Sequence, residues 1–277
     1  MVFATAAFSS AHAIIRYVSQ EIHPFEIGFF RTALGLIPLI PWCIWTRLPG
    51  LQRQKLGLYT SRAGVSTLAM MTFFLGVSLT PLAEASALNF SAPLFASAAA
   101  ILFLREKASL LRWFALGFGF LGALVILRPG FGTVSIGGLI VLLSSFFVAW
   151  VFILIKLLSR TESSLAITVH TSLLQVPMTL LIALPVWHWP NAEQTLWMLL
   201  VGSLSMFGQI AMTQSFKEAD VTKVLPFQFF QLIWAVLIGY TLFAEIPDLW
   251  TWVGGVMIFL SSMFVAVKEA KLEKPEC

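Results

Sequence analysis

Two stretches of the chain combine amide and hydroxyl side chains with prolines inside apolar sequence. The first runs from Pro81 to Pro93 and contains Glu84, Ser86 and Asn89. At about 100° per residue, Ser86, Asn89 and Pro93 fall on one narrow face of a helix. A proline removes a backbone donor and frees a carbonyl, so Pro93 predicts a helix kink. Polar atoms within a lipid-length segment are costly unless they meet protein or water, so we expect this helix to line a polar cavity.

The second stretch repeats this combination near the other end of the chain. Pro226 precedes Gln228 and Gln231, and it predicts a second kink. Such amides and hydroxyls offer hydrogen bonds to a solute, and tryptophan rings can stack on a planar one. Hydrogen bonding between helices is the alternative for the polar residues, and packing or interface anchoring is the alternative for the tryptophans. The candidate substrate-binding residues are Ser86, Asn89, Gln209, Gln228, Gln231, Trp150 and Trp234.

Three ionisable residues within apolar segments are candidates for coupling or gating. Arg31 could hold an anionic substrate group or a carboxylate across the bundle, or it could extend to the outer headgroups. Glu84 could carry a proton, because desolvation raises the pKa of a carboxylate, or it could be a helix N-terminal residue stabilised by the helix dipole. His170 could relay protons, or it could be a buried histidine with a structural role.

The composition identifies the class of protein. Of the 277 residues, 58% are hydrophobic and 11% are charged, and the mean hydropathy is +0.89. A soluble domain carries roughly 25% charged residues, so this chain is expected to be an all-α polytopic membrane protein. The net charge of +4 is spread between apolar segments, which argues against a nucleic-acid partner. Cys43 and Cys277 are too few for a disulfide framework or a metal cluster, and no cofactor is expected.

Ten apolar segments are long enough to be transmembrane helices, each of which needs roughly 20 residues. The first lacks a basic leading region and is expected to be a retained helix rather than a signal peptide. Lysines and arginines gather in the loops that lie inside if both termini are cytoplasmic, and this orientation in the inner membrane is our prediction. The predicted spans are 2–19, 25–46, 56–78, 82–104, 110–127, 135–157, 165–187, 195–216, 221–243 and 249–267.

An internal repeat relates the two halves of the chain. An offset of 139 residues pairs Pro38 with Pro177 and Trp113 with Trp252, and it keeps spans and loops in phase. Because each half has an odd number of spans, the copies must be inverted relative to one another, a plan that recurs in secondary transporters. The predicted domains are a first repeat at 1–130, a second repeat at 131–267 and a cytoplasmic tail at 268–277.

A literal match to the dinucleotide-binding pattern occurs between Gly117 and Gly122. It follows no strand and lies in a lipid-length segment, so we interpret it as small-residue helix packing. The chain has no phosphate-binding loop of the nucleotide-hydrolysing type.

Several runs of sequence together resemble those of a known transporter family. These runs are 29–33, 81–95, 104–106 and 122–130, with a second copy at 243–245 and 252–255. They are similar to the drug/metabolite transporter superfamily, specifically to proteins built of two EamA-type domains. The second copy departs at two positions, where Leu232 replaces the proline of the first copy and Lys223 replaces its glutamate. This departure argues against a fully symmetrical site.

The resemblance implies ten helices, alternating access, and a central cavity lined by the first, third and fourth spans of each repeat. We therefore expect a secondary-active or facilitative transporter of a small organic metabolite in a bacterial inner membrane, not an enzyme. A multidrug or toxic-metabolite exporter of the same fold is one alternative, and a membrane-embedded enzyme acting on a lipid is another. The expected partners are a small-molecule substrate and the lipid bilayer, with protons as a candidate coupling ion. The protein could be a monomer or a homodimer.

Overall fold

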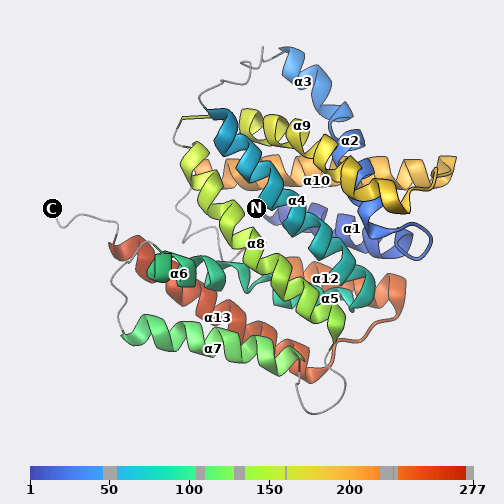
Figure 1. Cartoon of the computed structure of the whole chain (residues 1–277). Helices are drawn as coiled ribbons and strands as arrows, with labels where there is room; N and C mark the ends of the chain where they lie inside the picture. Colours follow the sequence, from blue (N-terminus) through green and yellow to red (C-terminus); the bar gives the residue numbers. More distant parts are fainter. Residues whose placement is uncertain are drawn as a thin grey trace.

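The computed structural model describes residues 1–45, 55–103, 110–127, 135–159, 161–218, 227 and 230–272. Within these ranges the chain forms helices and short connections, and no residue there forms a β-strand (Figure 1). The helices are α1 (Val2–Val18), α2 (Pro24–Gly35), η1 (Ile37–Leu39), α3 (Ile40–Trp45), α4 (Leu56–Leu79), α5 (Leu82–Asn89), α6 (Ala92–Phe103), α7 (Leu110–Leu127), α8 (Ile136–Ser159), α9 (Ser164–Ala183), η3 (Leu184–Val186), α10 (Ala192–Glu218), α12 (Phe230–Phe243) and α13 (Leu249–Leu272).

The helices have the lengths and the apolar surfaces of a membrane protein. In the described part of the chain, four segments are long and apolar enough to cross a bilayer, namely 56–79, 136–155, 164–186 and 192–212. Shorter apolar helices include α1, α12 and parts of α7 and α13. Large apolar side chains lie on the outside, as with Phe114 at 73% exposure and Leu110 at 78%. This surface suits lipid, and the protein is an all-α, multi-pass membrane protein, as the composition predicted.

The predicted second span is interrupted in the structure. It is divided into α2, the short 3₁₀ helix η1 and α3, where the sequence analysis expected one helix over 25–46. Pro38 lies in the first turn of η1, and Pro41 follows in α3. Two prolines three residues apart remove two backbone donors from the helical ladder, which accounts for the interruption.

The predicted fourth span is also divided in two. α5 ends at Asn89 and α6 begins at Ala92, so Phe90 and Ser91 form the junction. Both junction residues donate backbone bonds to carbonyls three residues back, and the Ser91 hydroxyl donates to the Leu88 carbonyl at 2.6 Å. Pro93 is the second residue of α6. Because it has no N–H, the carbonyl of Asn89 has no helical donor four residues later.

Glycines allow the closest approaches between helices. α7 packs along α13 through Gly122 and Gly254, where a methyl group built on Gly122 would lie 2.8 Å from the Gly254 carbonyl oxygen. α2 packs on α10 in the same way through Gly35 and Gly202. Small residues let helix backbones approach closely in lipid, where association gains nothing from removing apolar surface from water. This is the packing that the glycine pattern of the fifth span predicts.

Helices of the first half of the chain pack mainly on helices of the second half. α4 lies along α8, and α10 lies along α1 (Figure 1). With the 139-residue offset, α4 corresponds to α10 and α1 corresponds to α8, so these two contacts are exchanged counterparts. α7 starts at Leu110 and α13 starts at Leu249, which keeps the same offset.

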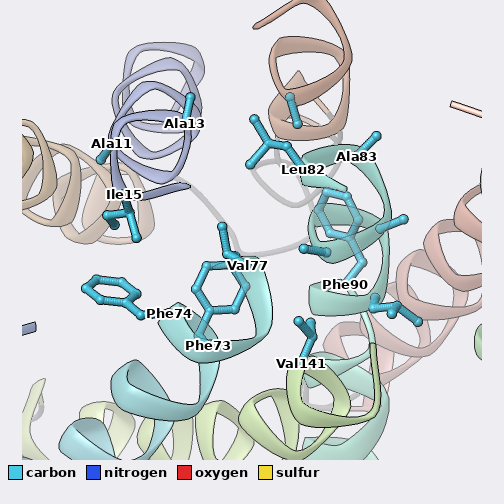
Figure 2. Close-up of a cluster of buried hydrophobic side chains, with 14 of the residues drawn as sticks. Ala11, Ala13, Ile15, Phe73, Phe74, Val77, Leu82, Ala83, Phe90 and Val141 are labelled. Carbon is cyan, nitrogen blue, oxygen red and sulfur yellow. The ribbon is translucent and has the colours of Figure 1, made fainter. Parts of the chain in front are cut away.

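A buried apolar cluster joins α1, α4, α5 and α8 at one end of the bundle. Phe73, Phe74 and Val77 of α4 point into the space between these helices, as Figure 2 shows. Val77 is fully buried, and so is Leu82 at the start of α5. The cluster fills this end of the molecule, and Phe73, Phe74 and Phe90 of the cluster also border the cavity described next.

Candidate functional site

A cavity of about 260 Å³ lies between the helices of the bundle. Its walls come from α1, α2, α4, α8, α9 and α10, from the junction of α5 and α6, and from the start of α12. Both second spans, α2 and α9, therefore contribute, in addition to the first, third and fourth spans that the family resemblance implied. This volume is just below the roughly 300–1,000 Å³ of typical small-molecule pockets.

Amide side chains from four helices line the cavity. Asn89 is the last residue of α5, Gln209 lies in α10, and Gln231 is the second residue of α12. The helix interruption places Asn89 at the wall, because α5 ends there. The Ser9 hydroxyl of α1 donates to the backbone carbonyl of Gln231 at 2.9 Å, which fixes the start of α12 against α1. Gln175 of α9 is a fourth lining amide, which the sequence analysis did not select.

Arg31 of α2 also lines the cavity, and its guanidinium lies against α4. Its Nη1 contacts the Met70 sulfur at 2.7 Å, and its Cζ lies 5.6 Å from the centre of the Phe74 ring. Its Nε is buried and has no hydrogen-bond partner. The side chain is thus directed into the bundle, and it does not extend to the outer headgroups.

Two further basic side chains line the cavity. Arg62 is only 4% exposed, and it donates to the Ile167 carbonyl at 3.1 Å and to the Thr171 hydroxyl. Near the start of the predicted third span, Arg62 is expected to be one of the cytoplasmic charges of the loops, but the structure places it nearly two turns inside α4, where it ties α4 to α9. The buried Nδ1 of His12 in α1 has no hydrogen-bond partner.

The remaining wall includes five phenylalanines. Phe8, Phe73, Phe74, Phe90 and Phe152 line the cavity together with methionines and small residues. The His12 ring lies 4.7 Å from the Phe73 ring, centre to centre. Such rings offer faces on which a planar or apolar solute can stack.

Three of the candidate substrate-binding residues lie away from the cavity wall. Ser86 of α5 is 2% exposed, and its hydroxyl has no hydrogen-bond partner. Trp150 of α8 is half-buried and does not line the cavity. Trp234 of α12 is also half-buried outside the wall, and its buried Nε1 has no hydrogen-bond partner.

The other ionisable candidates are likewise outside the wall. Glu84, in the first turn of α5, lies beside the start of α8, where its Oε1 would be 3.2 Å from a methyl group built on Gly138. His170 of α9 is 8% exposed, and its ring lies edge-on to Tyr59 at 5.4 Å. Gln228 and Pro226 lie outside the described residues.

An ion pair holds the end of the bundle opposite to the cavity. Arg16, in the last turn of α1, pairs with Glu245, which follows α12, and both side chains are 19% exposed. Arg16 also donates to the Thr80 carbonyl, and Glu245 accepts the backbone N–H of Leu82 at 3.1 Å. The pair therefore joins α1, the connection between α4 and α5, and the end of α12. The cavity is displaced toward the other end, where α4 and α9 begin and α8 ends.

Comparison with known proteins gives the family of this fold. The sequence profile of the EamA-like transporter family matches residues 1–128 and 135–267, nearly the whole chain. The chain belongs to the EamA-like transporter family. This EamA-like protein has the family that its sequence motifs indicated, and its fold also matches a solved crystal structure at 16% identity. That match has a TM-score of 0.65 and covers 99% of this chain and 97% of the other.

Named relatives of this EamA-like protein are transporters. It is 29% identical to a riboflavin transporter of Vibrio cholerae, over 100% of this chain and 94% of the relative. It is 25% identical to an S-adenosylmethionine uptake transporter of Rickettsia prowazekii, over 92% of this chain and 87% of the relative. It is 29% identical to the pseudopaline exporter CntI of Pseudomonas aeruginosa, over 94% of this chain and 92% of the relative. These findings support a small-metabolite transporter of the EamA type.

Proposed function

We propose that this EamA-like protein carries a small organic metabolite through the central cavity by opening it to one side of the membrane at a time. The observation that carries the proposal is the amide-lined cavity at the junction of α5 and α6. An interrupted helix that lines a cavity between the two repeats is a recurring feature of substrate sites in secondary transporters. The relatives named for riboflavin, S-adenosylmethionine and pseudopaline support a metabolite of comparable chemical type. We further propose that the chain acts as a carrier and not as an enzyme.

In this proposal, the two halves of the chain move relative to each other. We assign residues 1–130 and 131–267 to two inverted repeats, and 268–277 to a tail. The exchanged contacts of α4 with α8 and of α1 with α10 support the assignment, since each half presents equivalent helices to the other. Rocking of one half against the other would then open the cavity alternately.

The charge distribution supports an orientation with both termini in the cytoplasm of a cell with an inner membrane. Arg47, Arg53 and Lys55 lie between the second and third spans, which the positive-inside bias assigns to the cytoplasm. In this orientation the cavity is displaced toward the cytoplasmic side. The ion pair between Arg16 and Glu245 then holds the outer side closed.

The test measures solute flux in liposomes that contain the purified protein. The solutes are those named for the relatives, riboflavin, S-adenosylmethionine and pseudopaline. Because their names cover uptake and export, flux is measured in both directions, with and without a proton gradient. Asn89→Leu and Gln231→Leu should abolish flux and leave the unfolding temperature nearly unchanged. Thr241→Leu, on the lipid-facing side of α12, is the matched control and should transport normally. Normal flux in both amide variants would remove the cavity from the transport path.

A further inference from the structure

The Arg31 guanidinium is the most unusual polar group of the cavity wall, because it lacks an anionic partner in the described structure. The ion pairs found among the described residues are Arg16 with Glu245 and Lys55 with Glu162, and neither involves Arg31. The contacts of Arg31 are a thioether sulfur and an aromatic ring face, on Met70 and Phe74. Its Nε is buried and unpartnered.

These contacts leave most of the hydrogen-bonding capacity of the side chain unused. A guanidinium has five N–H donors, a thioether is a weak acceptor, and a ring face attracts the charge without accepting in-plane bonds. A buried cation without an anion is costly, so proteins pair buried charges. The side chain borders the cavity, so an oxygen acceptor for its free N–H groups, on a solute or on water, would lie there.

The rest of the wall favours an anion at this position. Arg62 and His12 also line the cavity, and none of the described side chains that line it is acidic. Arg62 already has neutral partners, the Ile167 carbonyl and the Thr171 hydroxyl. Arg31 is thus the guanidinium that remains available. Its planar fork matches the two oxygens of a carboxylate or of a phosphate.

We propose that Arg31 binds the carboxylate or phosphate oxygens of the transported solute, whose ring or apolar part lies on Phe73 and Phe74. The proposal rests on the proposed function and adds the substrate class, an organic anion or a zwitterion with an exposed oxyanion. Phe74 is the ring beneath the guanidinium, and Phe73 is the ring next to it in α4, tilted against the His12 ring. The aromatic surface and the oxyanion site are therefore next to each other.

The test uses four probes that share one ring and differ in charge. The purified protein is heated with phenylacetate, phenyl phosphate, 2-phenylacetamide or 2-phenylethylamine, and the shift of the unfolding midpoint is titrated. Further arms contain sodium chloride or inorganic phosphate alone. Phenylacetate, phenyl phosphate or both should stabilise the protein, while the amide and the amine should not. Stabilisation by one of the two anions identifies which oxyanion the site accepts.

Variants of Arg31 then assign the effect to this side chain. Arg31→Gln should weaken the apparent affinity for the anionic probe by roughly tenfold or more, since bonds to charged groups are among the strongest. Arg31→Lys should keep part of the affinity. Lys55→Gln, which removes a positive charge outside the cavity, should keep all of it. If Arg31→Gln does not fold, the four probes on the unaltered protein and on Arg31→Lys still decide.

Several results would overturn this assignment. They are equal stabilisation by the amide, unchanged anion affinity in Arg31→Gln, an effect of the inorganic ions alone, or no stabilisation by either organic anion. Liposome flux separates this failure from failure of the proposed function. Flux restricted to neutral or cationic solutes would refute the oxyanion site and leave transport intact. Anion binding without flux of any solute would refute transport and leave the site intact.

Discussion

The ion pair between Arg16 and Glu245 gives a quantitative prediction about how the bundle is held closed. Each side chain is 19% exposed, so the pair is mostly buried, and Glu245 also accepts the N–H of Leu82 at the start of α5. Exposed pairs contribute roughly 0.2–1 kcal/mol, and removing one partner of a fully buried pair costs about 3–5 kcal/mol. Glu245→Gln retains an oxygen for Leu82, so we expect an intermediate cost of about 1.4 kcal/mol for the closed state.

That cost corresponds to roughly a tenfold rise in the population of molecules open at this end. The assay places a cysteine at Val77, which is fully buried in the cluster below the pair, after both natural cysteines are replaced by serine. A membrane-impermeant maleimide then measures how often the position becomes accessible. Its labelling rate should rise about tenfold in Glu245→Gln.

The control removes the ion pair at the opposite end, in which Lys55 Nζ lies 2.5 Å from Glu162 Oε1. Glu162→Gln should leave labelling at Val77 unchanged or slower. An unchanged rate in Glu245→Gln would show that the pair does not hold this end closed. An equal rise in both variants would indicate general loosening of the bundle and would refute the reasoning as well.

Two further predictions concern backbone features of the fold. Pro93→Ala restores an N–H that can bond to the Asn89 carbonyl, so α5 and α6 should become one continuous helix. The unfolding temperature should then be equal or higher, and solute flux should fall. Full flux in this variant would show that the interruption is dispensable. Gly122→Val should destabilise the protein by about 1–3 kcal/mol, because even its Cβ would overlap the Gly254 carbonyl. Gly117→Val, where a Cβ would meet no atom of a neighbouring segment within 4 Å, should be nearly neutral in the same thermal unfolding assay, and equal losses in the two variants would contradict the packing argument.

The features read most directly from the sequence are those set by local chemistry. Segment length and apolar content predicted the membrane class, and Pro93 predicted an interruption close to where α5 ends and α6 begins. Amides within apolar spans are rare enough to attract attention, and Asn89, Gln209 and Gln231 indeed border the cavity. Their role in binding stays a prediction.

The arrangement of residues around the cavity is not visible in the sequence because lipid and protein interior are both apolar. A soluble helix shows its inner face by amphipathic periodicity, but a membrane helix need not. Nothing local therefore distinguishes Trp234, which lies off the cavity wall, from Phe73, which lines it. The same limit explains Arg62, whose position near a span end resembles a cytoplasmic anchor although tertiary contacts with α9 bury it.

The central claim is that solute crosses through the cavity, and blocking the cavity tests it most directly. Ser66 of α4 lines the cavity, whereas Leu68, two residues later, is 46% exposed on the outer surface of the same helix. We would compare liposome flux of the metabolite panel for the unaltered protein, Ser66→Trp and Leu68→Trp. The account predicts flux in the unaltered protein and in Leu68→Trp, and its loss in a folded Ser66→Trp. Equal flux through Ser66→Trp, or no flux of any panel solute in the unaltered protein, would contradict it.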